Sequence, residues 1–436
     1  MANSPASTQI LEFQTPSSEF IRPFHSVALG ILERLTDPNL DIPPRTMSER
    51  SQPKRFPEFC DRRLKRIGEI LADDTSRRNF IAKIYRAGRI LATIAVAGYA
   101  LVLIAGILCF RFIGESNLTI AYLLYFPRIV FLIPAIIVFP IGLLFCRRVS
   151  VLLAITSAIF IFYSMGWKLR PEPTATPSSP GTTLTVLTYN RGQHANQSLQ
   201  PFKNLTDPDV IVLQEAGSRA AGYASAEGYE KFLHTIDEAE FTILSRYPIL
   251  AAESIRVPSS QNEIPVAARF EIDFEGGRIA LYAIHVISPR DALRSYRRGA
   301  FLWGVLGIPG TPFGKKREAY QVFWDNRIEE ARTLRQIILE DPLPTLIAGD
   351  LNAPAGGYIH GLFRSEFEDA HPAGGSGFGY TFPGTTRNPL SLGGPWMRLD
   401  YLFCDSRWET EWCITEKERP SQHRAVTAQF RLLEEP

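Results

Sequence analysis

The stretch PTLIAGDLNAP, residues 344–354, joins a short apolar run to two polar side chains. Residues 345–348 predict a short buried strand, and Gly349 follows it as a flexible joint. Because side chains alternate along a strand, Asp350 and Asn352 are expected on the same face at its end. A carboxylate beside an amide can hold a water molecule and a polar substrate, but Asp and Asn are also frequent in turns. The stretch alone leaves both interpretations open.

Strand patterns of the same kind recur through residues 183–434, which are expected to form one catalytic domain. Strands are predicted at 183–190, 209–215, 241–249, 265–274, 278–286, 344–352, 397–403 and 425–433. Helical periodicity is clear at 325–340 and weaker near 197–205. Many strands with few helices between them predict an α+β fold, a four-layer α/β sandwich of two packed mixed β-sheets flanked by helices.

Three apolar segments precede this domain and predict about three transmembrane helices within residues 83–167. The first, 90–110, contains no charged residue and is about the ~20 residues that a spanning helix needs. The other two, 129–145 and 150–165, are at the short end of that range. A buried core helix is the alternative for the first segment. Residues 1–82 are expected to form an N-terminal cytoplasmic region, and the Pro-, Ser- and Thr-rich residues 168–182 a linker.

The basic residues around these segments predict their orientation. Lys83, Arg86 and Arg89 precede the first span, and Arg147-Arg148 lie between the second and the third. Positive residues in short loops favour the cytoplasmic side. The sequence therefore predicts a multi-pass protein whose catalytic domain is extracytoplasmic, as in the periplasm-facing proteins of a bacterial inner membrane.

Charge and cysteine content exclude some classes of protein. The formal net charge of +2 is too small to predict general coating of nucleic acid. The five cysteines include no CxxC pair and no zinc-ligand spacing. Cys404 and Cys413 follow each other closely, so a hairpin could join them by a disulfide in an oxidising compartment. Two free buried thiols are the alternative.

Polar residues recur where the predicted strands end: Asn190, Glu215, His285, Asp350, Asn352, Asp400 and His423. In sequence they occur as TYN, QE, a strand-borne His, GDLN, RLDY and S-x-H. Over about 182–433 this order resembles the endonuclease/exonuclease/phosphatase superfamily, the deoxyribonuclease-I-like phosphohydrolases. The membrane segments before such a domain resemble a group of bacterial membrane proteins. The resemblance implies phosphoester hydrolysis and says little about the substrate.

The resemblance also implies a metal site and a proton acceptor. Glu215 is expected to be the main ligand of a divalent cation, Mg²⁺ (or Mn²⁺), supported by Asn190; such cations take oxygen ligands. Asp350 is expected to orient and deprotonate the attacking water, and Asn352 to fix the phosphate.

Two histidines are implied to contact the phosphoryl group. His423, held by Asp400, and His285 on the other side are expected to stabilise its developing charge. Positioning and charge neutralisation account for most of the catalysis of phosphoryl transfer.

Two departures from the family pattern leave a second function open. Gln422 stands where the family usually has Asp, and Gly192 where some of its nucleases carry a metal-binding acid. Both remove negative charge, so a catalytically weak or inactive membrane receptor for a phosphorylated ligand is the alternative.

An insertion after His285 is expected to influence the choice of substrate. It is rich in Arg, Lys and aromatic residues, from Arg290 to Arg317. Such a surface suits anionic lipid headgroups at a bilayer or a nucleic-acid backbone. Nucleic acid, nucleotides and phospholipid headgroups therefore all remain candidate substrates, with the lipid bilayer as a partner.

Overall fold

The computed structural model describes residues 74–172, 182–192, 198–258, 264–384, 389, 392–419 and 421–433. The predictions for residues 1–73 and for 173–181 of the linker lie outside these ranges. By its contacts the chain divides into two units, Met1–Phe80 and Ile81–Pro436. Only residues 74–80 of the first unit are described, and everything below concerns the second.

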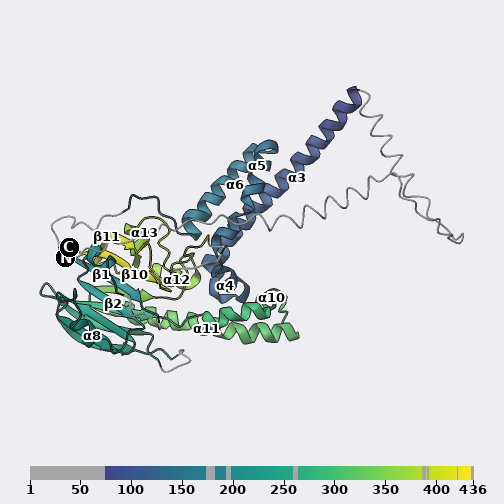
Figure 1. Ribbon diagram of the computed structural model, residues 1–436. Helices are drawn as coiled ribbons and strands as arrows, with labels where there is room; N and C mark the ends of the chain where they lie inside the picture. Colours follow the sequence, from purple (N-terminus) through teal and green to yellow (C-terminus); the bar gives the residue numbers. More distant parts are fainter. Residues whose placement is uncertain are drawn as a thin grey trace, which may run out of the picture. The chain divides into compact units, whose positions relative to one another are not determined.

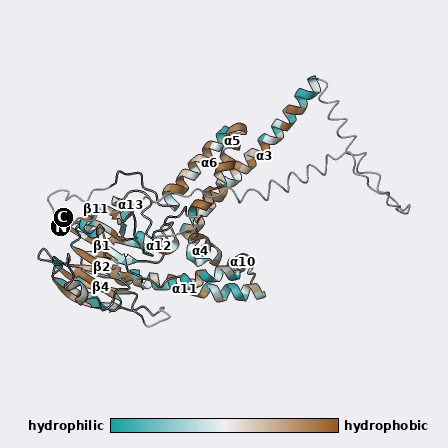
Figure 2. Ribbon diagram, in the orientation of Figure 1, coloured by the Kyte–Doolittle hydropathy of each residue, from teal (hydrophilic) through white to brown (hydrophobic). Residues whose placement is uncertain are grey.

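Three of the described helical segments are long and apolar enough to cross a membrane: Asp74–Ser116, Arg128–Phe145 and Arg147–Ser164. Their apolar character is evident in Figure 2 as brown stretches of the ribbon on α3, α5 and α6. The elements of this region are α3 (Asp74–Leu108), η2 (Cys109–Ile113), η3 (Gly114–Ser116), α4 (Leu118–Leu124), η4 (Arg128–Leu132), α5 (Ala135–Phe145), α6 (Arg147–Ile159) and η5 (Phe160–Ser164). The predicted three apolar helices are therefore present, and the first begins well before residue 90.

Two six-stranded mixed sheets form the domain that follows (Figure 1). The first has the order β11-β12-β1-β2-β4-β3 and the second β5-β6-β7-β8-β10-β9. In each sheet one pair is parallel, β1 with β2 and β7 with β8. The strands are β1 (Thr183–Asn190), β2 (Val210–Gln214), β3 (His234–Glu238), β4 (Phe241–Ser245), β5 (Ile249–Ile255), β6 (Ala267–Phe274), β7 (Gly277–His285), β8 (Thr345–Asp350), β9 (Glu368–Asp369), β10 (Asp400–Cys404), β11 (Trp408–Thr415) and β12 (Val426–Leu432).

The core between the sheets consists of inward side chains from both. Val186 and Phe430 of the first sheet belong to the same buried cluster as Phe270, Leu281 and Leu346 of the second. Each side chain that alternation directs inward loses its contact with water, and this burial drives the two sheets together.

Helices cover the outer faces of both sheets. Ile328 and Leu334 of α11 pack with Tyr282 and Ile347 of the second sheet, whereas Phe202 of α7 packs with the first. These helices are α7 (Phe202–Thr206), α8 (Ala220–Ala224), α9 (Arg290–Arg294), η6 (Ser295–Arg298), α10 (Ala300–Leu306), α11 (Pro312–Leu339), α12 (Tyr358–Arg364) and α13 (Ala370–Gly374). The predicted sandwich of two mixed sheets flanked by helices is confirmed.

The apolar helices and the sandwich share a core. Val96 and Phe110 of the first helical segment belong to one buried cluster with Trp324 of α11 and with Met397 and Leu399 before β10. Tyr122 of α4 stacks edge-on against Trp324, with ring centroids 6.2 Å apart. The segment between the first and second apolar helices is therefore packed into the domain that follows.

Cys404 and Cys413 are free and buried. The sequence suggested that a hairpin might place their strands side by side, but β10 belongs to one sheet and β11 to the other. The prediction of a disulfide is therefore wrong, and the alternative of two free buried thiols is confirmed. Burial raises the pKa of each thiol to about 12.

Candidate active site

The seven predicted site residues meet at one end of the sandwich, where the two parallel strand pairs finish. Asn190 ends β1 and Glu215 follows β2; His285 ends β7 and Asp350 ends β8. Parallel neighbours end at the same edge, which is why these four side chains gather there. Antiparallel β10 starts at this edge, since Asp400 pairs with Asp350.

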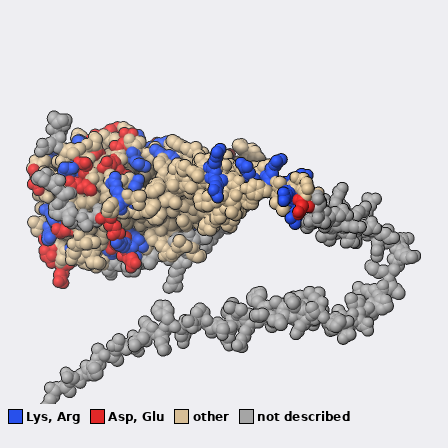
Figure 3. Space-filling model, turned by 90° about the horizontal axis from the view of Figure 1, so that it is seen from above, with Lys and Arg blue, Asp and Glu red and all other residues tan. Residues whose placement is uncertain are grey.

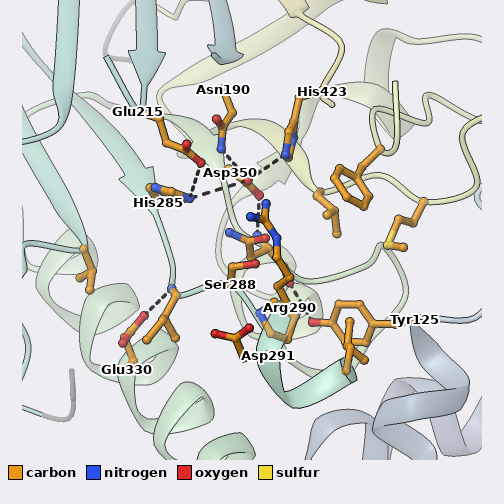
Figure 4. Close-up of a pocket in the computed structure, with 18 of the residues that line it drawn as sticks. Tyr125, Asn190, Glu215, His285, Ser288, Arg290, Asp291, Glu330, Asp350 and His423 are labelled. Atoms are coloured by element: carbon orange, nitrogen blue, oxygen red, sulfur yellow. Dashed lines mark hydrogen bonds and ion pairs between the residues drawn. The ribbon is translucent and has the colours of Figure 1, made fainter. Parts of the chain in front are cut away.

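A cavity of about 930 Å³ opens over this edge. Asn190, Glu215, His285, Asp350, Asn352 and His423 all line it. In the close-up view their polar atoms point toward one another around Asp350 (Figure 4). The structure therefore brings together residues that are spread over more than half of the sequence.

Asp350 lies at the centre of the cluster. Its Oδ2 accepts a hydrogen bond from Asn190 Nδ2 at 3.0 Å. The same oxygen lies 3.8 Å from His423 Nε2 and 3.9 Å from His285 Nε2. Burial and the charge of Asp400 raise the pKa of Asp350 to about 6, against the opposing effect of the two histidines. A carboxylate with this pKa can accept a proton near neutral pH.

Asn352 is held in place by its backbone and its amide. Its N–H donates to Asp350 Oδ1 at 2.7 Å, and its Nδ2 donates to the Val286 carbonyl at 2.9 Å. Asn352 and Glu215 are non-glycine residues with left-handed backbones, at φ of 52° and 51°. Such conformations cost energy and concentrate at functional sites.

Gly349 permits the close approach of β7 and β8 just before Asp350. Its φ is 148°, and a Cβ at this position would lie 2.1 Å from the Ile284 carbonyl oxygen. Any side chain here would push apart the strands that carry His285 and Asp350.

His423 is oriented by Asp400, as predicted. Its Nδ1 lies 2.9 Å from Asp400 Oδ2, and Asp400 is fully buried. Burial lowers the pKa of His423, but the charges of Asp400 and Asp350 outweigh it and raise the pKa overall. This pair favours a protonated imidazole facing Asp350.

His285 has a carboxylate partner that the sequence did not indicate. Its Nδ1 lies 2.8 Å from Glu240 Oε1 in the turn between β3 and β4. Burial lowers the pKa of His285, but the bond to Glu240 and the charges of Glu240, Asp350 and Glu215 raise it to about 9. Glu240 lies in the turn after β3, a strand with few apolar residues. The local sequence therefore gives no sign that this glutamate differs from one exposed to solvent.

The donor set fits a divalent cation. Asp350, Asp400 and His423 offer polar atoms that all lie within 4.8 Å of one another, and Glu215 is not part of this group. A protonated His423 has no free lone pair for a metal, so the carboxylates are the groups that can serve as ligands. Among the described residues, the buried Asp400 Oδ1 is one of the side-chain atoms without a hydrogen-bond partner. Glu215, the predicted main ligand, lies 4.0 Å from His285 on the other side of Asp350. Carboxylates gathered at one point favour Mg²⁺ or Mn²⁺. Both polar atoms of the Asn190 side chain have partners in the protein. Its Nδ2 donates to Asp350, and its Oδ1 accepts from Gly192 N at 2.9 Å.

A buried clamp behind the site links it to the apolar helices. Tyr125, which follows α4, donates from its hydroxyl to the Asn352 carbonyl at 2.8 Å. Arg327 of α11 donates to the same carbonyl and to the Tyr125 hydroxyl, each at 2.9 Å, and to the Ile287 carbonyl. Sequence analysis missed both residues, because a Tyr beside an apolar run and an Arg on a helix carry no distinctive signal.

Residues 192–423, more than half of the chain, match the endonuclease/exonuclease/phosphatase family. The chain belongs to this family. No curated protein matches the sequence.

The solved structures that match this chain have low sequence identity and low TM-scores. A humanized TDP2 of D. rerio is 18% identical, covers 57% of this chain and 99% of its own, and has a TM-score of 0.40. A family member from Beutenbergia cavernae is 17% identical, covering 58% and 72% of the two chains at a TM-score of 0.39. A mannosyl-6-phosphatase from Bacteroides thetaiotaomicron is 14% identical, covering 57% and 99% at a TM-score of 0.39.

The two departures from the usual endonuclease/exonuclease/phosphatase pattern have structural explanations. Gln422 is exposed, and its Oε1 accepts a hydrogen bond from Arg290 at 3.2 Å. Gly192 has a φ of 62° and supports Asn190 through its backbone N–H. A side chain at Gly192 would be strained in this conformation, whereas an acid at 422 would pair with Arg290.

Proposed function

We propose that the protein is a membrane-anchored, divalent-metal-dependent phosphoester hydrolase. The observation that carries the proposal is the position of Asp350 between two imidazoles. His285 and His423 each lie within 4 Å of Asp350 Oδ2, and each is bound to a carboxylate of its own, Glu240 or Asp400. Membership of the endonuclease/exonuclease/phosphatase family supports phosphoester hydrolysis as the chemistry of this site.

In the proposed reaction Asp350 accepts a proton from the attacking water. The water oxygen bonds to phosphorus, the bond from phosphorus to the leaving oxygen breaks, and the leaving oxygen takes up a proton from solvent. Asp350 returns its own proton to solvent, so atoms and charge balance. The protonated His285 and His423 donate to phosphoryl oxygens, whose negative charge grows in the transition state. Asn352 donates its free amide hydrogen and orients the group.

Glu215 would hold a Mg²⁺ or Mn²⁺ ion, with Asn190 as a supporting residue. When bound, such an ion neutralises phosphate charge and favours attack on phosphorus. The residues of the chain remain responsible for orienting the substrate and for moving the proton.

We place the protein in a membrane through its three apolar helices. Lys83, Arg86 and Arg89 belong to the N-terminal half of α3. Figure 3 shows Lys and Arg side chains gathered at one end of a mostly uncharged surface. With Arg147 and Arg148 they support cytoplasmic ends at these points and an extracytoplasmic site.

The test is hydrolysis of bis-(p-nitrophenyl) phosphate by the full-length protein in detergent, with and without Mg²⁺. We expect release of p-nitrophenolate that EDTA abolishes. Asp350→Asn keeps the volume of the side chain but cannot accept the proton, and its rate should fall by about 10²-fold or more. A rate retained by Asp350→Asn with unchanged melting would exclude Asp350 as the base.

The second candidate function is a membrane receptor that binds a phosphorylated ligand without hydrolysing it. Gln422 and Gly192, which replace acids found in relatives, favour it. Binding of a nucleotide without turnover, together with no hydrolysis of bis-(p-nitrophenyl) phosphate in the same preparation with intact melting and Mg²⁺ present, would support the receptor over the enzyme.

A further inference from the structure

The cavity is larger than a phosphoryl group requires, and part of its wall is apolar. At about 930 Å³ it is near the upper end of the volumes of small-molecule pockets, roughly 300–1,000 Å³. Besides the polar cluster around Asp350, its wall includes Tyr122, Phe126, Leu293, Tyr296, Met397 and Leu399. A substrate that fills this space has a sizeable apolar group attached to its phosphate.

Part of this wall comes from the membrane region. Tyr122 and Phe126 lie between the apolar segments Asp74–Ser116 and Arg128–Phe145. The Tyr122 hydroxyl is bonded to the Ala292 carbonyl at 3.0 Å and to Ser295 Oγ, which fixes α9 and η6 against α4. The apolar side of the cavity is thus continuous with the helices proposed to cross the bilayer.

The insertion continues this apolar surface on the outside. Tyr296 contacts Tyr122 and Phe301, with ring centroids 5.8 and 5.9 Å apart, and α10 packs against α4 through a Thr119 hydroxyl bond to the Phe301 carbonyl. Beyond Phe301, apolar side chains that are 47–66% exposed follow one another: Leu302, Val305, Leu306, Ile308 and Phe313. Lys315, Lys316 and Arg317 come directly after them.

Exposed apolar side chains beside cations are typical of a helix that lies in the headgroup region of a bilayer. In Figure 1, α10 lies next to α4, at the end of α3 that is nearer the sheets. A membrane crossed by α3 would therefore meet α10 at its surface, close to the apolar side of the cavity. The aliphatic members of the wall, Leu293, Met397 and Leu399, offer a nucleic-acid base no ring to stack on, whereas a hydrocarbon chain packs against aliphatic and aromatic side chains alike.

We propose that the substrate is an amphiphilic phosphoester taken from the bilayer. Its phosphoryl group lies at Asp350, His285 and His423, and its hydrocarbon chains pass along Tyr122, Phe126 and Leu293 toward the membrane. This inference rests on the proposed function and narrows it to lipid phosphoesters. Arg290, which donates to Gln422 next to His423, lines the same cavity and supplies positive charge near the headgroup, whereas the nearby Arg294 is paired with Asp291 at 2.9 Å.

The experiment compares chain lengths under one headgroup. Full-length protein in nanodiscs is given dioleoyl or dihexanoyl phosphatidate, and dioleoyl or dihexanoyl phosphatidylglycerol, with the dihexanoyl lipids below their micelle concentration. Bis-(p-nitrophenyl) phosphate is measured in parallel. We expect kcat/KM to be higher for a dioleoyl lipid than for its dihexanoyl partner by about tenfold or more, which corresponds to ~1.4 kcal/mol.

Variants separate binding in the cavity from simple delivery by the membrane. Leu293→Ser should reduce the dioleoyl-to-dihexanoyl ratio of kcat/KM about tenfold. Tyr296→Ser, at a side chain that is 48% exposed and therefore tolerant of replacement, should act in the same direction. Leu205→Ser, at an exposed leucine on α7, is the matched control and should leave the ratio unchanged.

Each outcome decides one of the two proposals. A ratio near one in the wild type, or a ratio that Leu293→Ser and Tyr296→Ser do not alter, would overturn the lipid inference. An oligonucleotide is tested as a further substrate. Its hydrolysis, with none of the four lipids hydrolysed, would also overturn the lipid inference. If bis-(p-nitrophenyl) phosphate is still hydrolysed in these cases, the proposed function stands. Failure to hydrolyse any of the substrates would refute the proposed function itself.

Discussion

Replacing Tyr125 by Phe removes one hydroxyl from the clamp behind the site and leaves the ring in place. The hydroxyl donates to the Asn352 carbonyl and accepts from Arg327 Nη1. The ring remains packed against Trp324, with centroids 5.6 Å apart. The perturbation is therefore confined to two hydrogen bonds.

The magnitude follows from what each partner retains. The Asn352 carbonyl keeps its bond from Arg327 Nη2, so the loss there is one bond of roughly 1 kcal/mol. Arg327 is 1% exposed, so its Nη1 donor loses a partner that water does not readily replace, at a cost of ~1–3 kcal/mol. We expect the free energy of unfolding to fall by roughly 2–4 kcal/mol.

The effect on turnover is separate from the effect on stability. Asn352 adopts a left-handed backbone that the clamp helps to hold, and loosening it displaces the amide that meets the phosphate. We expect kcat to fall about tenfold at temperatures well below melting, with a smaller change in KM.

The assay is hydrolysis of bis-(p-nitrophenyl) phosphate by full-length protein, together with thermal melting in the same detergent. Tyr358→Phe is the control, because it removes a similar hydroxyl from an exposed bond to Arg332. The control should melt and turn over as the wild type does. If Tyr125→Phe melts lower but keeps its kcat, the clamp is structural only and the positioning role of Tyr125 is refuted.

Three further predictions concern ionisation, cysteine chemistry and orientation. The rate should fall as the pH drops through about 6, where Asp350 takes up a proton, and as it rises through about 9, where His285 loses one. Glu240→Gln removes the negative charge that helps to raise the pKa of His285 and leaves only a neutral acceptor. A pH–rate profile of this variant should have its upper limb at lower pH, and an unmoved limb would separate Glu240 from the chemistry. Maleimide labelling of the denatured, unreduced protein should modify Cys404 and Cys413 in full, since both are free and buried in the fold; protection of this pair from the reagent would contradict the structure. A reporter that is active only in the periplasm should be active when fused after residue 180, and one that is active only in the cytoplasm should be inactive there. The reason is that the basic residues from Lys83 to Arg89 and at Arg147 resist translocation. The reverse pattern would move the site to the cytoplasm.

Local pattern in the sequence was sufficient for the two sheets and for most of the site. Alternation predicted the strands that carry Asn190, Glu215, His285 and Asp350, and unbroken apolarity predicted the three long helices. Strands β3, β5, β9 and β11 were missed. β3 and β5 are at most half-buried, β9 has two residues, and β11 alternates with glutamates. Periodicity reports burial on one face, so it is weak where neither face is fully buried.

Only the tertiary structure decided how the site residues are partnered. Glu240 lies 45 positions before His285, and Tyr125 lies 227 positions before Asn352. Side-chain hydrogen bonds depend on which surfaces pack together, and no spacing in the sequence records that. The same reason explains the cysteines, which are close in sequence but on strands of different sheets. The sequence therefore determined which residues can do the chemistry, whereas packing determined their protonation, their support and the apolar wall that the region of the apolar helices adds to the cavity.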